Sequence, residues 1–472
     1  MKPRLALGAR VRIDRRDGTR VLLSPERGLR LGETAAAIVD LCDGVRSFDA
    51  IVDELAVRYP GADRATIAAD AGTLLADLRA RGLIADFALD TGEGVRASAA
   101  PDGEPGDRSG PSPYTLVAEL THRCALACPY CSNPRGLTRG HDELSTAEWL
   151  RVIDDAASLG VMQVHLSGGE PLARGDLEAI AARARERDLY VNLVTSGVPL
   201  ESERLARLAP SIDHVQLSVQ DADAVASDHV AGISAFHQKM RVAAWVREMG
   251  LPMTLNVVLH RQNIDRVADV VAMAERLGVD RLELANVQLV SWALDNRAAL
   301  LPSRDQIERA RAVATAAKHR LDGRMQIIFV LPDWHSGRPR ACMDGWARRF
   351  VVVAPDGAVL PCHAARALPL VFETVRSRPL REVWENGDAL RAYRGEDWMA
   401  EPCKSCDQRS VDFGGCRCQA FELTGDAGAT DPACSLSPRH AIVLAARAEG
   451  ERPADADVRF LFRGRTAGAV RS

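Results

Sequence analysis

The chain has 472 residues, of which 47% are hydrophobic and 26% charged, a composition typical of a globular protein with roughly three domains. Its formal charge of −4 and pI of about 6.3 exclude binding to nucleic acid or to an anionic membrane through overall charge. No apolar run reaches the roughly 20 residues of a membrane-spanning helix, and the N-terminal stretch becomes charged before a signal-peptide core forms. We therefore expect a cytoplasmic protein, in which 11 cysteines at short spacings indicate metal binding rather than disulfides.

Residues 1–90 are predicted to form a small winged-helix-like α+β domain. Apolar alternation at residues 11–13 and 21–23 flanks the pair Asp17-Gly18, which is typical of a β-hairpin. After Gly32 the apolar period becomes helical and predicts three helices.

Basic residues gather at the beginning of this domain. Residues 1–30 hold nine Lys and Arg against three Asp and Glu, although residues 1–90 as a whole are balanced. This basic end is open to two interpretations, a solvated face or a docking surface for an acidic peptide. The following residues 91–113 are dense in Gly, Pro, Ser and Asp, which predicts a flexible linker.

From residue 114 to 335 the pattern alternates between strands and helices. Ser145 and Glu148 stand at the spacing of a capping box and mark one helix start. The predicted strands are Tyr114–Leu120, Met162–Ser167, Tyr190–Thr195, His214–Val219, Met253–Leu259, Arg281–Ala285 and Met325–Val330. This order predicts an α/β fold with a parallel sheet, a full or partial (β/α) barrel whose chemistry gathers at the C-terminal ends of the strands.

Three cysteines follow the first of these strands directly. Cys124, Cys128 and Cys131 have the spacing Cx3Cx2C, and three thiolates on one loop can hold three irons of a cubane cluster and leave the fourth iron open. A zinc knuckle is the alternative, but structural zinc needs a fourth ligand and no nearby cysteine supplies it. The spacing therefore favours an iron–sulfur cluster.

Polar groups also follow the next strands. Ser167-Gly168-Gly169-Glu170-Pro171 ends the second strand, where the two glycines allow close backbone approach and Glu170 offers a carboxylate to a cationic amine. The third strand ends in Thr195-Ser196-Gly197, and Ser218 lies in the fourth. We expect these groups to line one site.

The predicted C-terminal segment, residues 336–440, has little regular periodicity and carries most of the remaining cysteines. A hairpin is predicted over 350–354 and 358–360, and the segment is expected to fold around its metal. Residues 441–472 are expected to form a tail. Cys42 stands apart on an apolar helix and is predicted to be an inert core thiol.

The combination of Cx3Cx2C with the Gly-Gly-Glu-Pro turn resembles the radical S-adenosylmethionine (radical-SAM) superfamily. The resemblance implies a partial barrel and a [4Fe–4S] cluster on the three loop cysteines, whose open iron binds the amino and carboxylate groups of S-adenosylmethionine. It also implies cofactor contacts at Tyr130, Gly168, Gly169, Glu170, Ser196 and Ser218. It implies no further catalytic side chain.

The remaining cysteine spacings resemble the SPASM extension of peptide-modifying radical-SAM enzymes, except that Asp412 stands where that pattern has a cysteine. A carboxylate oxygen can bind iron, so the resemblance implies two auxiliary iron–sulfur clusters, with a [2Fe–2S] type left open for one of them. One would be held by Cys342, Cys362, Cys416 and Cys418, and the other by Cys403, Cys406, Asp412 and Cys434.

Residues 114–436 resemble the PqqE family of pyrroloquinoline quinone biosynthesis in the stretches ELTHRCALACPYCSNP, SGGEPLARGDL, LPDWHSGRPRACMDGW and EPCKSCDQRSVDFGGCRCQAF. Residues 3–90, especially VLLSPERGLRLGETAAAIVDLCDG, resemble PqqD, the chaperone that presents the precursor peptide PqqA. The chain therefore resembles a fusion in which the PqqD function is supplied in cis. The implied activity is an oxidoreductase that joins Glu and Tyr side chains of PqqA through a carbon–carbon bond.

An unactivated C–H bond on Glu requires a cofactor radical, and an auxiliary cluster is a plausible acceptor for the electron lost when the Tyr ring regains aromaticity. A flavodoxin-like or similar protein is the expected electron donor. His260 and Gln288 are candidates for substrate contact or for structural roles. Two alternative functions stay open, a SPASM-type maturase of another peptide and a non-catalytic peptide-binding scaffold.

Overall fold

The computed structural model describes residues 1–14, 17–24, 27–87, 112–136, 142–452 and 460–463. The chain divides into two compact units, Met1–Gly110 with Leu321–Gln326, and Pro111–Arg320 with Ile327–Ser472. Most of the predicted linker, residues 91–111, lies outside the described residues. Within them, no helix is both long enough and apolar enough to cross a bilayer.

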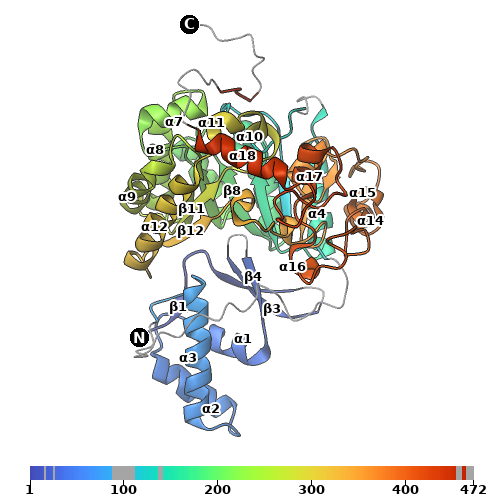
Figure 1. The fold of residues 1–472 in the computed structure, drawn as a ribbon. Helices are drawn as coiled ribbons and strands as arrows, with labels where there is room; N and C mark the ends of the chain where they lie inside the picture. Colours follow the sequence, from blue (N-terminus) through green and yellow to red (C-terminus); the bar gives the residue numbers. More distant parts are fainter. Residues whose placement is uncertain (15–16, 25–26, 88–111, 137–141, 453–459, 464–472) are drawn as a thin grey trace. The chain divides into compact units, whose positions relative to one another are not determined.

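The N-terminal unit combines two small antiparallel sheets with three helices. Its strands are β1 Arg4–Leu5, β2 Arg10–Ile13, β3 Arg20–Ser24, β4 Arg27–Leu31 and β5 Ile84–Ala85, and its helices are α1 Glu33–Asp40, α2 Phe48–Arg58 and α3 Arg64–Ala80. The predicted hairpin and three helices are confirmed, and β4 adds a third strand in the order β2-β3-β4. β1 pairs with β5 in a separate two-stranded sheet. α2 and α3 lie side by side (Figure 1).

The core of this unit is built from the apolar faces of the helices and of β3. Leu22, Ile51, Leu75 and Leu78 are all fully buried. Cys42 lies in the same cluster with 5% exposure, and burial raises the pKa of its thiol to about 12. Its prediction as an inert core thiol agrees with this environment.

The second unit is organised around a nine-stranded sheet with the order β12-β11-β10-β9-β8-β7-β6-β13-β14. Its strands are β6 Thr115–Glu119, β7 Gln163–Ser167, β8 Tyr190–Thr195, β9 His214–Ser218, β10 Met253–Leu259, β11 Arg281–Asn286, β12 Gln326–Val330, β13 Phe350–Val353 and β14 Val359–Leu360. The register of β6 to β11 is parallel throughout. In the described pairings β12 and β14 are the edges of this sheet, and no pairing described between them closes a barrel.

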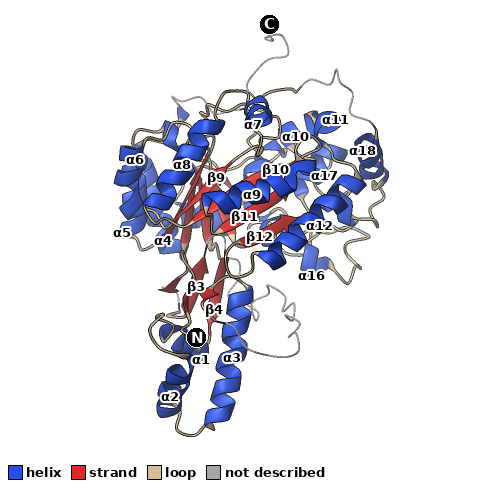
Figure 2. Cartoon of the chain, turned by 90° about the vertical axis from the view of Figure 1, so that its left-hand side faces the viewer, coloured by secondary structure: helices blue, strands red, loops and turns tan. Residues whose placement is uncertain are grey.

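Helices that follow the strands form one layer against the sheet (Figure 2). They are α4 Thr146–Leu159, α5 Leu177–Glu186, α6 Ser202–Leu208, α8 Phe236–Glu248, α9 Val267–Leu277 and α12 Arg304–Arg320. The strand residues that alternate toward them are aliphatic and fully buried, such as Leu166, Leu193, Leu217 and Leu255. The opposite face of the sheet is polar, and this face carries the site described below.

The remaining helices connect these elements and build the C-terminal part of the chain. They are α7 Ala224–Ala231, α10 Ser291–Asp295, α11 Arg297–Leu300, α13 Asp333–Ser336, α14 Leu380–Asn386, α15 Asp388–Arg391, α16 Arg409–Asp412, α17 Arg417–Thr424 and α18 Ala441–Glu451. The 3-10 turns are η2 Pro171–Ala173, η3 Ala209–Ser211, η4 Ile264–Arg266, η5 Cys342–Asp344 and η6 His363–Ala367.

Two features differ from the sequence-based expectation. The predicted hairpin β13–β14 is present, but β13 also pairs in parallel with β6 and extends the main sheet. Residues 441–451, which were expected to belong to a tail, form α18, which contacts α11, α12 and α13. Both differences depend on contacts between residues far apart in sequence, which local patterns do not reveal.

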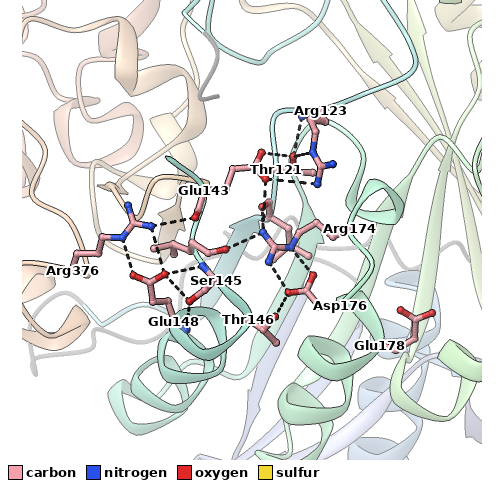
Figure 3. A network of polar contacts seen from close by, with 12 residues as sticks. Thr121, Arg123, Glu143, Ser145, Thr146, Glu148, Arg174, Asp176, Glu178 and Arg376 are labelled. Atoms are coloured by element: carbon pink, nitrogen blue, oxygen red, sulfur yellow. Dashed lines mark hydrogen bonds and ion pairs between the residues drawn. The ribbon is translucent and has the colours of Figure 1, made fainter. Parts of the chain in front are cut away.

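The predicted capping box at the start of α4 is confirmed. The Ser145 hydroxyl accepts from the Glu148 N–H, and Glu148 accepts from the Ser145 N–H at 2.7 Å. Arg376 donates from Nε to the same carboxylate at 2.8 Å and from its Nη atoms to the carbonyls of Asp142 and Glu143 (Figure 3). The hydrogen bond from Arg376 is the main cause that lowers the pKa of Glu148 to about 2.

We expect Arg376→Leu to lower the free energy of unfolding by about 0.5–1 kcal/mol, because Arg376 is itself partly exposed and solvent screens the pair. Since the folded-state pKa of Glu148 is depressed, its contribution is complete above the ordinary value of 4.5 and is lost as the pH falls toward about 2. Denaturant unfolding of the cluster-free chain across this window should show the difference between variant and wild type shrinking. Arg311→Leu, which removes an exposed pair with Glu308, is the control. A constant difference at every pH would contradict the assignment.

Candidate active site

The loop that follows β6 brings the three cysteines of the Cx3Cx2C motif together. Cys124 and Cys128 each lie close enough to Cys131 for their charges to interact, and Cys124 and Cys128 also interact electrostatically with each other. The loop packs on the C-terminal end of α7 and the segment that leads to α8, and the Ala127 N–H donates to the carbonyl of Ala231 in α7 at 2.9 Å. Burial raises the pKa of all three thiols, so a bound metal would have to displace their protons.

The Gly-Gly-Glu-Pro turn lies directly against this loop. The Gly169 N–H donates to the Thr121 carbonyl at 2.6 Å, and the Glu170 N–H donates to the Arg123 carbonyl at 2.8 Å. A Cβ atom at Gly168 would meet the Thr121 oxygen at 2.4 Å, and one at Gly169 would meet the Arg123 oxygen at 2.5 Å. Both glycines are therefore required by the approach of two backbone segments, which positions the turn beside the cysteines.

Glu170 is 1% exposed and its carboxylate is engaged within the protein. Oε1 accepts from the Thr195 hydroxyl at 2.6 Å and from the Leu172 N–H at 3.2 Å, while Oε2 accepts from the N–H and hydroxyl of Ser196 at 2.8 and 2.5 Å. These four bonds use the lone-pair sites of a carboxylate. Glu170 therefore joins the ends of β7 and β8, and its contact with a cofactor amine stays a prediction.

The aromatic residue of the cysteine motif lies beside His260. The ring centroids of Tyr130 and His260 are 5.7 Å apart, and Gln220 makes a hydrogen bond to the Tyr130 side chain. Burial lowers the pKa of His260 to about 3, so this ring is neutral and fully enclosed. The position of His260 supports a structural role, in which its ring packs beside the ring of Tyr130. Gln288 is partly exposed and donates weakly to the Asn286 carbonyl.

The polar face of the sheet places the predicted contact Ser218 beside two further candidates, Asn256 and Glu283, that the sequence analysis did not single out. Ser218, Asn256 and Glu283 are directly aligned across β9, β10 and β11, and all three are partly exposed. Two rows deeper on the same face, His214 contacts Asn192 at 2.7 Å and Thr254 at 2.9 Å, and its burial lowers its pKa to about 3. Polar residues at every second position of these strands were the sequence signal that could have identified this polar face.

Two cations approach the cysteine loop and were also missed. Arg463 is 7% exposed and donates to the carbonyls of His122 and Leu126, on either side of Cys124. Lys239 on α8 is fully buried and donates to Gln220. Burial lowers the pKa of Lys239 to about 8, against the opposing influence of Cys128, Glu170 and Cys124. No local pattern marks Arg463, whereas Lys239 stands on an apolar helical stripe.

A polar network holds the start of the cysteine loop (Figure 3). The Thr121 hydroxyl donates to Glu143 at 2.5 Å and accepts from the Arg123 N–H at 3.0 Å. Arg174 is 7% exposed, pairs with Asp176 and donates to the carbonyls of Leu120 and Leu144. The loop, the end of β7 and the start of α4 are thus fixed to one another.

Four cysteines of the C-terminal segment form a closed ring of thiols. Cys342 is hydrogen-bonded to Cys362 and Cys416, and Cys418 is hydrogen-bonded to the same two residues. These bonds and burial raise the pKa of Cys342 and Cys418, while the same bonds lower the pKa of Cys362 and Cys416. The structure therefore brings together the whole set that the SPASM resemblance implies for the first auxiliary cluster.

The second implied set also lies together. The charge of Asp412 acts on both Cys403 and Cys434, and Cys434 also interacts electrostatically with Cys406. Asp412 Oδ1 accepts from the Gly414 N–H of its own turn at 2.9 Å. Its other oxygen therefore has capacity for a further partner.

Within the described part of the chain, no group of three or more His, Cys, Asp or Glu side chains has the geometry of a ligand shell around one metal ion. In a [4Fe–4S] cluster each thiolate binds a different iron, so the donor sets fit clusters by their chemistry rather than a single ion. A cavity of about 320 Å3 lies elsewhere, among residues that include Arg304, Trp334 and Arg447. Its lining contains none of the predicted ligands.

Three family descriptions match this chain. Residues 118–274 match the radical SAM superfamily, residues 19–84 match coenzyme PQQ synthesis protein D (PqqD), and residues 342–407 match the iron-sulfur cluster-binding domain SPASM. The PqqA peptide cyclase of Granulibacter bethesdensis is 52% identical over 334 residues, which are 70% of this chain and 89% of that protein. The PqqA peptide cyclase of Rhodopseudomonas palustris is 50% identical over 362 residues, 76% of this chain and 96% of that protein.

The chain belongs to the PqqA peptide cyclase family. It carries a PqqD region fused ahead of the radical-SAM region. The cofactors of this radical-SAM and SPASM architecture are a [4Fe–4S] cluster with S-adenosylmethionine and auxiliary iron–sulfur clusters.

Solved structures support the fold of this cyclase-family chain. Streptococcus suis SuiB bound to S-adenosylmethionine has a TM-score of 0.59 at 16% identity, covering 92% of this chain and all of that one. SuiB bound to the precursor peptide SuiA gives 0.60 at 15% identity with the same coverage. At this identity the likeness establishes the fold alone.

We expect Asp412→Cys to retain an auxiliary cluster with an altered reduction potential, and Asp412→Ala to impair cluster assembly, because a carboxylate is a harder ligand than a thiolate. Iron quantitation and potentiometric EPR on the reconstituted chain measure both effects. Asp397→Ala, an exposed acid of the same region, is the control. Identical spectra in wild type and in both Asp412 variants would remove Asp412 from the ligand set.

Proposed function

We propose that this chain catalyses the formation of a carbon–carbon bond between a Glu and a Tyr side chain of the precursor peptide PqqA. The observation that carries the proposal is the cysteine loop fixed against the Gly-Gly-Glu-Pro turn, in a chain about 50% identical to PqqA peptide cyclases. When bound, the cluster and S-adenosylmethionine supply the radical that removes a hydrogen atom from an unactivated C–H bond.

The residues of this chain would bind, orient and shield the reacting groups. Cys124, Cys128 and Cys131 would hold the cluster, and Tyr130 with Ser196 and Ser218 would contact the cofactor. The polar row Ser218, Asn256 and Glu283 faces the same side of the sheet as Ser167 at the end of β7. This row offers hydroxyl, amide and carboxylate groups with which to orient a peptide.

We propose that each predicted domain has a separate task. Residues 1–90 would bind the precursor peptide, 91–113 would tether that domain, and 114–335 would carry the radical chemistry. Residues 336–440 would hold the two auxiliary clusters, on Cys342, Cys362, Cys416 and Cys418 and on Cys403, Cys406, Asp412 and Cys434. Residues 441–472 would complete the fold through α18 and Arg463.

The reaction as proposed is an oxidation of the peptide. One C–H bond on Glu and one on the Tyr ring are replaced by one C–C bond, so two hydrogen atoms leave the peptide in total. One leaves as a hydrogen atom taken by the cofactor radical, and the other leaves as a proton and an electron. An auxiliary cluster is the proposed acceptor of that electron, and a flavodoxin-like protein the proposed donor that reduces the first cluster.

Mass spectrometry of the precursor peptide after anaerobic incubation with the reduced, cluster-loaded chain tests this function. We expect a product lighter by two hydrogen atoms, with fragmentation that shows Glu and Tyr in one cross-linked unit. A thioether or other modification of a different peptide, with PqqA unchanged, would instead identify another maturase. Absence of S-adenosylmethionine cleavage in the fully loaded chain would favour a binding scaffold.

A further inference from the structure

Lys239 is an isolated buried cation beside the cysteine loop. It is one of four lysines in the chain, and it is fully buried on α8 with Val242, Ala243 and Val246 on the same helical face. Burial of an ammonium group is costly unless a negative charge compensates it. Among the described residues, Lys239 forms no ion pair, and its Nζ donates a hydrogen bond to the neutral Oε1 of Gln220.

The carboxylates near Lys239 are already engaged elsewhere. Glu170 accepts four hydrogen bonds from the ends of β7 and β8, as described above. Asp228 accepts from the N–H groups of Ala235 and Phe236 and from the Ser234 hydroxyl. Cys128 exerts the largest of the charge interactions that act on Lys239, ahead of Glu170, Cys124 and Asp228, so a negative cluster on the cysteine loop would add to the charges that compensate the buried cation.

Gln220 links Lys239 to this loop. It is 2% exposed, and its Nε2 donates to Cys128 Sγ at 3.9 Å while its Oε1 accepts from Lys239. The Asn263 side chain donates to the Gln220 carbonyl at 2.8 Å and holds this segment in place. Lys239 therefore orients the Gln220 amide so that its N–H groups face the sulfur.

We propose that Lys239, acting through Gln220, is a positioning residue that compensates the negative charge of the cluster on Cys124, Cys128 and Cys131 and raises its reduction potential. The inference rests on the proposed function, which places a cluster on this loop. Reduction adds one negative charge, so a nearby buried cation and an N–H···S bond stabilise the reduced state more than the oxidised state. Arg463 faces the same loop from the C-terminal segment and supplies a second cation.

The test compares the full-length Lys239→Met chain with wild type after anaerobic cluster reconstitution. The variant keeps the length of the side chain and removes its charge. Potentiometric EPR should show a lower midpoint potential for the S-adenosylmethionine-binding cluster, on the order of a tenfold change in the redox equilibrium, which is about 59 mV for one electron. Lys318→Met, an exposed lysine on α12, should leave this potential unchanged.

Thermal unfolding gives a second readout that a purely structural role would not produce. Lys239→Met should raise the melting temperature of the cluster-free chain, where burial outweighs the charges that compensate the cation, and lower that of the loaded chain. Should Lys239→Met fail to fold, Gln220→Leu removes the bond to Cys128 and should lower the potential in the same direction. The inference is wrong if the variant's cluster has the same midpoint potential as wild type, or if the substitution shifts the melting temperature equally with and without the cluster. Cyclisation of the peptide by the wild-type chain would then still support the proposed function. Failure of the wild-type loop to hold a cluster overturns the proposed function itself.

Discussion

Replacing Cys124, Cys128 and Cys131 together by alanine is expected to abolish reductive cleavage of S-adenosylmethionine and to leave iron on the auxiliary sites. The three residues form one group on a single loop, whereas the ring of Cys342, Cys362, Cys416 and Cys418 closes without them. Loss of the loop thiolates therefore removes one cluster and preserves the ligands of the others.

Anaerobic iron and sulfide quantitation, combined with EPR of the reduced chain, measures this outcome. Cys42→Ala is the matched control, because Cys42 is buried in the core of the N-terminal unit and its thiol donates to the Ile38 carbonyl at 3.3 Å. That variant should keep full cleavage activity and full iron content. Total loss of iron from the triple variant would show that the clusters are not held independently.

Deletion of residues 1–110 is expected to slow cross-linking of the precursor peptide by on the order of 100-fold at low peptide concentration. β4 pairs only with β3 in the described sheet, so one edge of the strand offers unpaired backbone groups to an added strand. A tether of residues 91–113 with a reach of about 25–30 Å would hold a bound peptide at roughly millimolar effective concentration.

The basic character of the domain contributes less to this expectation than its sequence implied. Arg20 pairs with Asp40, and Arg30 pairs with Asp14 and Asp17, so part of the positive charge is neutralised within the fold. Backbone pairing along β4 therefore carries the prediction. Adding the excised domain in trans should restore part of the rate in a concentration-dependent way. A truncated chain that modifies the full-length peptide as fast as the intact chain would exclude the presenting role.

The strands of the barrel were predictable because their signal is local. The run Met253–Leu259 matches β10 at both ends, and β8 likewise occupies Tyr190–Thr195 as expected. Apolar and β-branched residues in short runs favour strands wherever they occur. The capping box of Ser145 and Glu148 was equally predictable from the sequence, because both residues lie within one helical turn.

The sequence by itself determined the fold class and the chemistry of the site, because three cysteines on one short loop and a Gly-Gly-Glu-Pro turn need no distant partner to be recognised. Only the tertiary structure decided that β13 joins β6, that Glu170 is saturated by Thr195 and Ser196, and that Lys239 and Arg463 approach the cysteines. Arg463 donates to the carbonyl of His122, 341 positions away. Such contacts form when packing closes long loops of chain, and no local propensity encodes which residues then meet.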